Sequence, residues 1–348
     1  FRSTGKTTTK DMLAAVLGTR LRTLKTAGNF NNEIGLPLTL LELDERHDAA
    51  VVEMAMRRPG EIDALCRLAG PTGAVITNIG ETHLELLGNV SNIASAKGEI
   101  LDHISPGGFA LLHAESPFIK REATRCRGKV VFFGTDRHAG VRAENIRLEN
   151  SGSRFDAVMG KERYSFLLPV PGRHNVINAL AAIGAGREMG LTVEEIARGL
   201  SKVSLTGMRL EVIEAAGMKI INDAYNASPV STKAALQVLK DLAGARRTVA
   251  VLGNMLELGP RSEEGHREVG ETAAGLGLDC LVTVGDLAVS IYEGALEAGL
   301  QGGRAFQCAD NAEAVKALKG FLQEGDVVLV KGSRGMKMEQ IVRSLLKK

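Results

Sequence analysis

Near the start of the chain, a short polar run has the composition of a phosphate-binding loop. The run consists of Ser3, Thr4, Gly5, Lys6, Thr7 and Thr8, and a helical pattern follows over residues 10–17. A Gly-Lys-Thr turn that opens a helix points backbone N–H groups and the positive end of the helix dipole at phosphate oxygens. In that arrangement the Lys6 ammonium reaches the terminal phosphates and the Thr7 hydroxyl binds Mg²⁺. The alternative is a chance Gly-Lys-Thr at a helix start.

Two polar side chains follow expected strands further along the first half. Glu53 ends the apolar run Val51-Val52, and His83 lies in the loop after the next expected strand. Parallel strands bring their C-terminal loops to one edge of the sheet, where ligands bind. We expect Glu53, an oxygen donor of the kind that Mg²⁺ prefers, to serve a metal there, with His83 beside it. Taken alone, Glu53 could equally be a solvated strand end and His83 a surface residue.

Two helical patterns in the first half carry further candidates. Lys97 lies among alanines, where a surface lysine is the ordinary case. Asn175 and Asn178 lie about one helical turn apart, so their amides share one face of a helix and could bond a purine edge. The same pair could instead cap that helix, and the residues alone favour capping.

The second half has three polar loops, each directly after an apolar run. They occupy residues 222–229, 253–259 and 331–335. Three such loops at one edge of a single parallel sheet indicate a binding site more strongly than three unrelated turns do. Each loop alone would be a weak signal.

The elements that must position these residues alternate between strands and helices. In the first half, β-branched runs at residues 49–54, 73–79, 109–112 and 129–133 are separated by helical patterns such as 60–69 and 92–104. This alternation predicts a parallel sheet covered on both faces. Residues 141–170 change to a period of two, which indicates a small antiparallel addition. A helix begins near His174, and Thr192 with Glu195 predicts a capping box for another.

The second half repeats the alternation with a core of its own. Strands are expected at residues 219–221, 248–252, 280–284 and 327–330, and helices at 231–242, 263–275, 288–298 and 312–322. The pattern predicts a second doubly wound unit. We therefore expect an α/β protein with two domains. A boundary near residue 205 gives a first domain of residues 1–205 with a mostly parallel sheet and a second, Rossmann-like domain of residues 206–348.

Composition sets the broad limits. The 348 residues are 44% hydrophobic and 24% charged, with a net charge of +2, as in a soluble globular protein. Scattered lysines and arginines give no basic stripe for nucleic acid, and no apolar run is long enough to span a membrane. Four separated cysteines without a C-x-x-C pair favour a reduced compartment. We expect a cytoplasmic monomer without a nucleic-acid partner.

Taken together, the motifs resemble those of the Mur ligases, the amide ligases of peptidoglycan synthesis. The resemblance runs from Ser3 to the C-terminus and rests most on residues 29–37, 224–229, 252–259 and 330–334. It implies an ATP-dependent ligase of the branch that joins D-alanyl-D-alanine to a UDP-N-acetylmuramoyl tripeptide through an acyl phosphate. The third residue of the tripeptide, diaminopimelate or lysine, stays open. A folylpolyglutamate synthase-like ligase is the alternative within the superfamily, and the Tyr225-Asn226 loop argues against it.

The resemblance also implies that residues 1–205 are a central ATPase domain with a P-loop-type, mostly parallel sheet, truncated at its N-terminus. It further implies roles for individual residues. It assigns catalysis to Lys6, Lys97, His83 and Arg209, and it assigns two Mg²⁺ ions to Thr7, Glu53, His83 and Lys97, with Lys97 carbamylated. ATP contacts fall to the loop from Ser3 to Thr8 and to Asn32, Asn175, Asn178, Arg209, Asp223, Asn226, Lys331 and Ser333.

The sequence departs from the family pattern at its beginning. The UDP-binding N-terminal domain and the strand before the phosphate loop are absent, and Phe1-Arg2 stand where the family has Thr-Gly. We therefore expect the 348-residue chain by itself to be inactive as a ligase. The rival from a different class is a nucleotide-binding module without activity.

Overall fold

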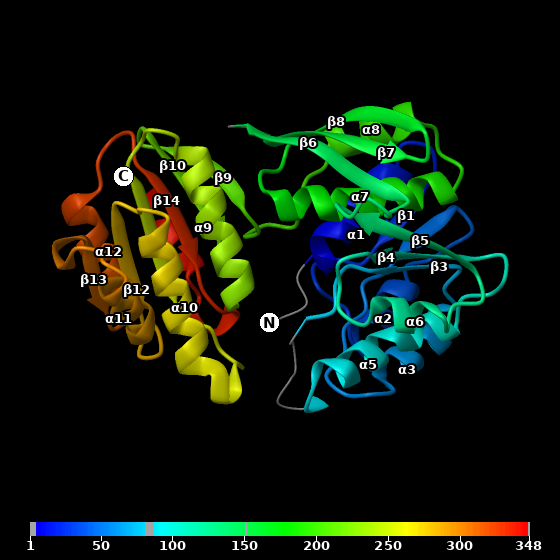
Figure 1. The fold of residues 1–348 in the computed structure, drawn as a ribbon, viewed down its shortest axis with the longest axis horizontal. Helices are drawn as coiled ribbons and strands as arrows, with labels where there is room; N and C mark the ends of the chain where they lie inside the picture. The colour runs from blue at the N-terminus through cyan, green and yellow to red at the C-terminus, as the bar shows by residue number, and fades with distance from the viewer. Residues whose placement is uncertain (1–4, 81–86, 150–151, 347–348) are drawn as a thin grey trace. The chain divides into compact units, whose positions relative to one another are not determined.

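The computed structural model describes residues 5–80, 87–149 and 152–346, and the chain divides into two compact units between Thr206 and Gly207 (Figure 1). Ser3, Thr4 and His83 lie outside the described residues. Both units are α/β with mostly parallel sheets, so the predicted fold class is confirmed. Among the helices of the described chain, none has the length and apolarity that a membrane crossing needs.

The first unit is built around two sheets. Its strands are β1 (Thr23–Lys25), β2 (Ala49–Val51), β3 (Gly73–Ile76), β4 (Phe109–His113), β5 (Lys129–Gly134), β6 (Val141–Glu149), β7 (Gly152–Met159) and β8 (Glu162–Leu168). Its helices are α1 (Lys6–Leu17), α2 (Gly35–Leu40), α3 (Glu61–Ala69), α5 (Val90–Asp102), α6 (Ile119–Ala123), α7 (Arg173–Glu188) and α8 (Val193–Ser201).

The strand pairing follows the predicted change of pattern at residue 141. Strands β1 and β2 pair in parallel, and the other sheet has the order β3-β4-β5-β6-β7-β8. Pairing is parallel from β3 to β6 and antiparallel from β6 to β8, which confirms the antiparallel addition. The capping box of Thr192 and Glu195 at the start of α8 is also confirmed.

A cavity of about 400 Å³ lies in the first unit beside β2 and β3. Residues 48–56 and 69–78 line it, together with side chains of α1 and α5. In the described chain β2 pairs only with β1 and β3 only with β4, so the cavity lies beside the unpaired edges of two sheets. The loop that follows β2 holds Glu53, and Lys6 of α1 and Lys97 of α5 line the same cavity.

The second unit is one six-stranded sheet with helices on both faces. Its strands are β9 (Glu211–Ala215), β10 (Met218–Asp223), β11 (Thr248–Gly253), β12 (Cys280–Val284), β13 (Ala305–Cys308) and β14 (Val327–Lys331). Its helices are α9 (Pro229–Ala243), α10 (Ser262–Gly275), α11 (Val289–Glu297), α12 (Asn311–Phe321) and α13 (Glu339–Leu346), with short 3₁₀ turns η1 (Gly259–Arg261), η2 (Gly302–Arg304) and η3 (Arg334–Met336).

The strand order of this sheet brings the three polar loops together. The order is β13-β12-β11-β14-β10-β9, and every pair is parallel except β10 with β9. Strands β11, β12 and β14 are buried along their whole length, as central strands between two helix layers must be. Because β10, β14 and β11 are neighbours, the loops after them meet at one edge, as the sequence predicts.

Candidate active site

The phosphate-binding loop is placed by the start of α1. The helix begins at Lys6, earlier than the pattern from residue 10 suggests, so Thr7 and Thr8 lie in its first turn and are buried. Gly5 caps the helix with a φ of 91°, a conformation in which a side chain is strained. The Asn178 side chain packs directly against Gly5, which brings a predicted ATP-binding residue to the loop.

Glu53 lies just after β2, and its two carboxylate oxygens differ in their hydrogen bonding. Its Oε1 accepts a hydrogen bond from Asn31 Nδ2 at 2.7 Å, and its backbone N–H donates to Thr26 Oγ1 at 3.0 Å. The residue is only 5% exposed, yet Oε2 has no hydrogen-bond partner within the described chain. A buried, unpaired carboxylate oxygen is the donor that a divalent cation takes, so Glu53 fits Mg²⁺.

Lys97 reaches from α5 to the end of β3. Its Nζ donates a hydrogen bond to the Asn78 carbonyl oxygen at 3.0 Å. Removal from water, together with the positive charge of Lys6, lowers the pKa of Lys97 to about 7. A large fraction of the side chain is therefore a neutral amine near pH 7, which is the form that reacts with CO₂. Lys6, Glu53 and Lys97 all line the one cavity, so the structure brings these three predicted residues together.

The asparagines of the first unit have structural partners as well. Asn175 Nδ2 donates to the Pro171 carbonyl oxygen at 2.7 Å, and Asn178 Nδ2 donates to Asn175 Oδ1 at 3.3 Å. The N-cap of α7 is Gly172 without a side-chain cap bond, so the prediction that the asparagines cap this helix is wrong. Asn32 Oδ1 accepts the Gly35 N–H at 2.9 Å and thereby shapes the start of α2.

Sequence reasoning missed the residues that anchor α1. Lys10 is buried, and its Nζ donates to the carbonyl oxygens of Thr26 at 2.8 Å and Gly28 at 2.9 Å. Asp11 accepts hydrogen bonds from Lys25 Nζ at 2.9 Å and from the backbone N–H of Thr206 at 2.7 Å. These contacts fix the helix that begins at the phosphate loop. The spacing of Lys10 and Asp11 gives no signal of this role, because both read as exposed polar positions.

The predicted residues of the second unit gather where β10 and β14 end. Lys331 Nζ contacts Asp223 Oδ2 at 2.5 Å and donates to the Asn226 carbonyl oxygen at 2.9 Å. Both charged side chains are almost fully buried. The Arg209 guanidinium lies over the Tyr225 ring, 4.0 Å from its centroid, and its buried Nε lacks a hydrogen-bond partner among the residues that the structure describes.

The loop after β11 is tied to the same edge. The Ser333 hydroxyl accepts the Leu256 N–H at 2.8 Å, and the Ser333 N–H donates to the Asn254 carbonyl oxygen at 3.0 Å. His266, which sequence reasoning missed, is fully buried and accepts the Met255 N–H on Nε2 at 2.8 Å. Burial lowers the pKa of His266, so the neutral ring holds this loop. Arg209, Asp223, Asn226, Lys331 and Ser333 thus belong to one structured edge.

Breaking the Lys331–Asp223 pair is expected to destabilise the protein strongly. In Lys331→Met the buried Asp223 carboxylate loses its cation, which typically costs about 3–5 kcal/mol. Urea unfolding of this variant measures the loss. Lys331→Met combined with Asp223→Asn should recover most of it, because the amide keeps an acceptor for the Leu210 N–H. Arg267→Met, in an exposed ion-pair group, is the matched control; a loss of equal size there would contradict the prediction.

The comparisons with known proteins cover both units. The Mur ligase middle domain family matches residues 3–186, and the Mur ligase glutamate ligase domain family matches residues 208–334. The UDP-N-acetylmuramoyl-tripeptide–D-alanyl-D-alanine ligase of Bacillus subtilis is 45% identical over 345 residues, which are 99% of this chain and 74% of that protein. The protein of the same name from Escherichia coli is 37% identical over 350 residues, with 99% and 75% coverage.

Solved structures agree with the sequence relatives. A crystal structure of MurF from Acinetobacter baumannii has a TM-score of 0.90 at 34% identity and covers 99% of this chain and 75% of that one. MurF from Thermotoga maritima in complex with ADP has a TM-score of 0.87 at 30% identity, with 99% and 78% coverage. A folylpolyglutamate synthase from Mycobacterium tuberculosis, 18% identical with a TM-score of 0.75, shares the fold alone. On the strength of its two matched domains and its relatives of high identity, the chain belongs to the Mur ligase family.

Proposed function

We propose that this protein joins D-alanyl-D-alanine to a UDP-N-acetylmuramoyl tripeptide at the expense of ATP, in the synthesis of peptidoglycan precursors. Relatives that carry this name align over 99% of the chain. The single structural observation that carries the proposal is the cavity at the start of α1. There, a lysine of the phosphate loop, a carboxylate with an open oxygen and a lysine with a lowered pKa face one space.

In the first step a carboxylate oxygen of the tripeptide attacks the γ-phosphorus of ATP, and the bond from that phosphorus to the β,γ-bridging oxygen breaks. ADP departs, and the tripeptide carries an acyl phosphate. Negative charge on the moving phosphoryl group is met by Lys6 and by the N–H groups at the start of α1. Thr7, Glu53 and carbamylated Lys97, with His83 as the resemblance implies, would hold Mg²⁺, which would supply positive charge against the phosphate oxygens. Thr7 and Glu53 supply the oxygen donors that this ion prefers.

Carbamylation changes what Lys97 contributes. The neutral amine attacks CO₂, a bond forms between nitrogen and carbon, and one proton leaves to solvent. The product is an anion where an ammonium would repel both Mg²⁺ and the neighbouring Lys6. The lowered pKa of Lys97 supports this proposal, because it supplies the neutral amine at physiological pH.

In the second step the amine of D-alanyl-D-alanine attacks the acyl carbon, and phosphate leaves as the amide bond forms. Arg209 is a cation that can meet the charge on the tetrahedral oxygen, and its stacking on Tyr225 holds the guanidinium plane. Asp223, Asn226, Lys331 and Ser333 bind the phosphates and ribose from the edge of the second unit. Asn32, Asn175 and Asn178 serve the nucleotide from the first unit. The protein acts as a cytoplasmic monomer.

Turnover on defined substrates tests the function. Because the sequence predicts that the 348-residue chain by itself is inactive, turnover here and in the variants is measured with this chain carrying Arg2→Gly and joined to the N-terminal UDP-binding domain of the Bacillus subtilis relative. This protein is given ATP, D-alanyl-D-alanine and UDP-tripeptide carrying either diaminopimelate or lysine, and ADP, phosphate and the product mass are followed. We expect one ADP and one phosphate for each pentapeptide product, and no product when D-alanyl-D-alanine is left out. ATP hydrolysis that never yields the pentapeptide, or ligation of glutamate to a folate instead, would contradict the proposal.

Removing the open carboxylate oxygen is expected to weaken metal use. Glu53→Gln should raise the Mg²⁺ concentration for half-maximal turnover by at least about tenfold. Asn31→Ala should raise it by a comparable factor, since partners that orient a metal ligand typically contribute 10- to 100-fold. Turnover measured across a Mg²⁺ titration gives the shift. Glu42→Gln, an exposed carboxylate in the same unit, is the control. Unchanged Mg²⁺ dependence in Glu53→Gln would exclude Glu53 as a ligand.

A further inference from the structure

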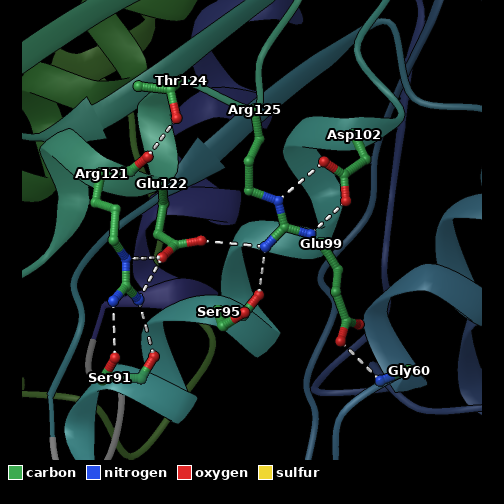
Figure 2. Close-up of polar contacts among 9 residues, drawn as sticks. All are labelled: Gly60, Ser91, Ser95, Glu99, Asp102, Arg121, Glu122, Thr124 and Arg125. Carbon is green, nitrogen blue, oxygen red and sulfur yellow. Dashed lines mark hydrogen bonds and ion pairs between the residues drawn. The ribbon is translucent and has the colours of Figure 1, made fainter.

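Helix α5, which carries Lys97, is held along one side by three side chains at the end of α6. We call Arg121, Glu122 and Arg125 the α6 clasp (Figure 2). The Glu122 side chain is only 4% exposed and lies between the two guanidinium groups. Its Oε1 accepts from Arg121 Nε at 2.8 Å and Nη2 at 2.7 Å, and its Oε2 accepts from Arg125 Nη1 at 3.1 Å. The buried carboxylate is therefore fully paired.

Both arginines of the clasp continue onto α5. Arg121 Nη1 donates to Ser91 Oγ at 2.8 Å, and Arg125 Nη1 donates to the Ser95 carbonyl oxygen at 2.8 Å. Arg125 Nε also donates to Asp102 Oδ1 at 2.9 Å. The positions 91, 95 and 102 share one face of the helix over about three turns. The clasp therefore fixes both the rotation of α5 and its position along its axis.

Helix α5 packs closely against the clasp at Gly98. Gly98 faces Glu122, and a Cβ built on it would lie 2.5 Å from Glu122 Oε2 and 2.9 Å from Arg125 Nη1. Glu122 cannot simply rotate away, because both arginines hold its oxygens. On another side of α5, Glu99 accepts the Gly60 N–H at 2.7 Å, so the helix is anchored on two sides.

We propose that Glu122, acting through Arg121 and Arg125, is a positioning residue that holds Lys97 at its place beside Asn78 and the cavity. The proposal rests on the role of Lys97 in the proposed function. Lys97 lies next to Gly98 in sequence and between the clasp contacts at Ser95 and Asp102, so a shift of α5 moves its Nζ from the Asn78 carbonyl. The clasp contains the buried charge of Glu122. Apolar side chains of similar volume would stabilise this contact at least as well. Fixed geometry is what such a charged contact adds.

Two variants disturb the clasp by opposite means. Glu122→Gln removes the charge and keeps the shape, and Gly98→Ala adds a methyl group that pushes α5 from the clasp while favouring the helix. For each we expect kcat to fall on the order of 10- to 100-fold. The KM for ATP should stay within about twofold, because the phosphate loop is not touched. The Lys97 carbamate, followed by ¹³C NMR in ¹³C-bicarbonate, should lose occupancy in the same order as kcat.

Thr192→Ala provides the matched control. It removes the capping box of α8, so it destabilises the same unit without touching α5. If both clasp variants keep the carbamate signal and kcat of this control, the clasp is only structural and the proposal is overturned. If the parent protein of the turnover assay, without a clasp variant, shows neither turnover nor a Lys97 carbamate, the proposed function fails instead. Should Glu122→Gln not fold, Gly98→Ala alone decides, because the added methyl favours helix formation.

Discussion

Replacing Gly5 with alanine is expected to abolish nucleotide binding, with a loss of affinity of at least about 100-fold. Two effects act together. The φ of 91° at Gly5 strains any residue with a Cβ, by roughly 1–3 kcal/mol. The new methyl group would also overlap with the Asn178 amide, since Cγ of that side chain lies 3.2 Å from the Cβ position and Oδ1 lies nearer still. Calorimetric titration with ADP or a non-hydrolysable ATP analogue measures the loss.

The chain contains controls that separate these two effects. Gly60 caps α3 with a φ of 85°, but a Cβ there meets nothing within 4 Å, so Gly60→Ala carries the strain without a clash. It should lower stability and leave nucleotide affinity unchanged. Adding Asn178→Ala to Gly5→Ala removes the clash and should restore only part of the affinity. If Gly5→Ala binds nucleotide as the original protein does, this turn is not the phosphate site.

The central elements of both sheets could be predicted from sequence because their patterns are strong. Apolar runs such as residues 327–330 are buried on both faces, and a short, β-branched run of this kind is typical of a central parallel strand. The missed strands are short or lie at an edge. Thr23–Lys25 is only three residues long, and Ala305–Cys308 has exposed residues at its centre, so neither forms an apolar run. The five-residue helix α6 is too short to show a period.

Some residues of the candidate site could be predicted from the sequence, and others could not. Lys6 and Glu53 could be found because a lysine at a helix start and a carboxylate after a strand are visible in the sequence, whereas Lys97, which lies in a helix, is assigned only by the resemblance to the Mur ligases. Their partners could not be found, because they act through atoms that residue type does not reveal. Asn78 contributes its backbone carbonyl, and the buried state of Glu122 depends on two arginines that the fold brings together. Pairing of this kind is a property of packing, which periodicity does not encode.

Replacing Lys97 with methionine is expected to lower kcat by about 100-fold or more, and at the same time to stabilise the protein at neutral pH. The loss of turnover follows because methionine cannot form a carbamate. The gain in stability follows because the native protein keeps an amine in a site that disfavours its charge, so the pKa of Lys97 is about 7, against the ordinary lysine value of 10.5. At a pH between these two pKa values, the unfolded chain binds more protons than the folded one.

The stabilisation expected for Lys97→Met depends on pH. The free energy of unfolding of the original protein should rise, relative to that of Lys97→Met, as the pH increases from about 7 toward 10, by a few kcal/mol at most. Urea unfolding at the two ends of this range, in buffers freed of CO₂, measures the difference. Lys161→Met, an exposed lysine in the same unit, should show no such change. Full turnover by Lys97→Met, or a stability difference that does not vary with pH, would contradict the prediction.

A residue that lowers stability and raises turnover is distinguishable from one that only supports the fold. A structural lysine such as Lys10 donates to two carbonyl oxygens and lies beside Asp11, so removing it should cost stability. Within the part of the chain that the structure describes, Lys97 donates a hydrogen bond to the Asn78 carbonyl oxygen and has a neighbouring cation in Lys6, so the fold gains little from its charge. Opposite signs of the stability change in Lys10→Met and Lys97→Met, with turnover lost in the second, would identify Lys97 as a group retained for chemistry.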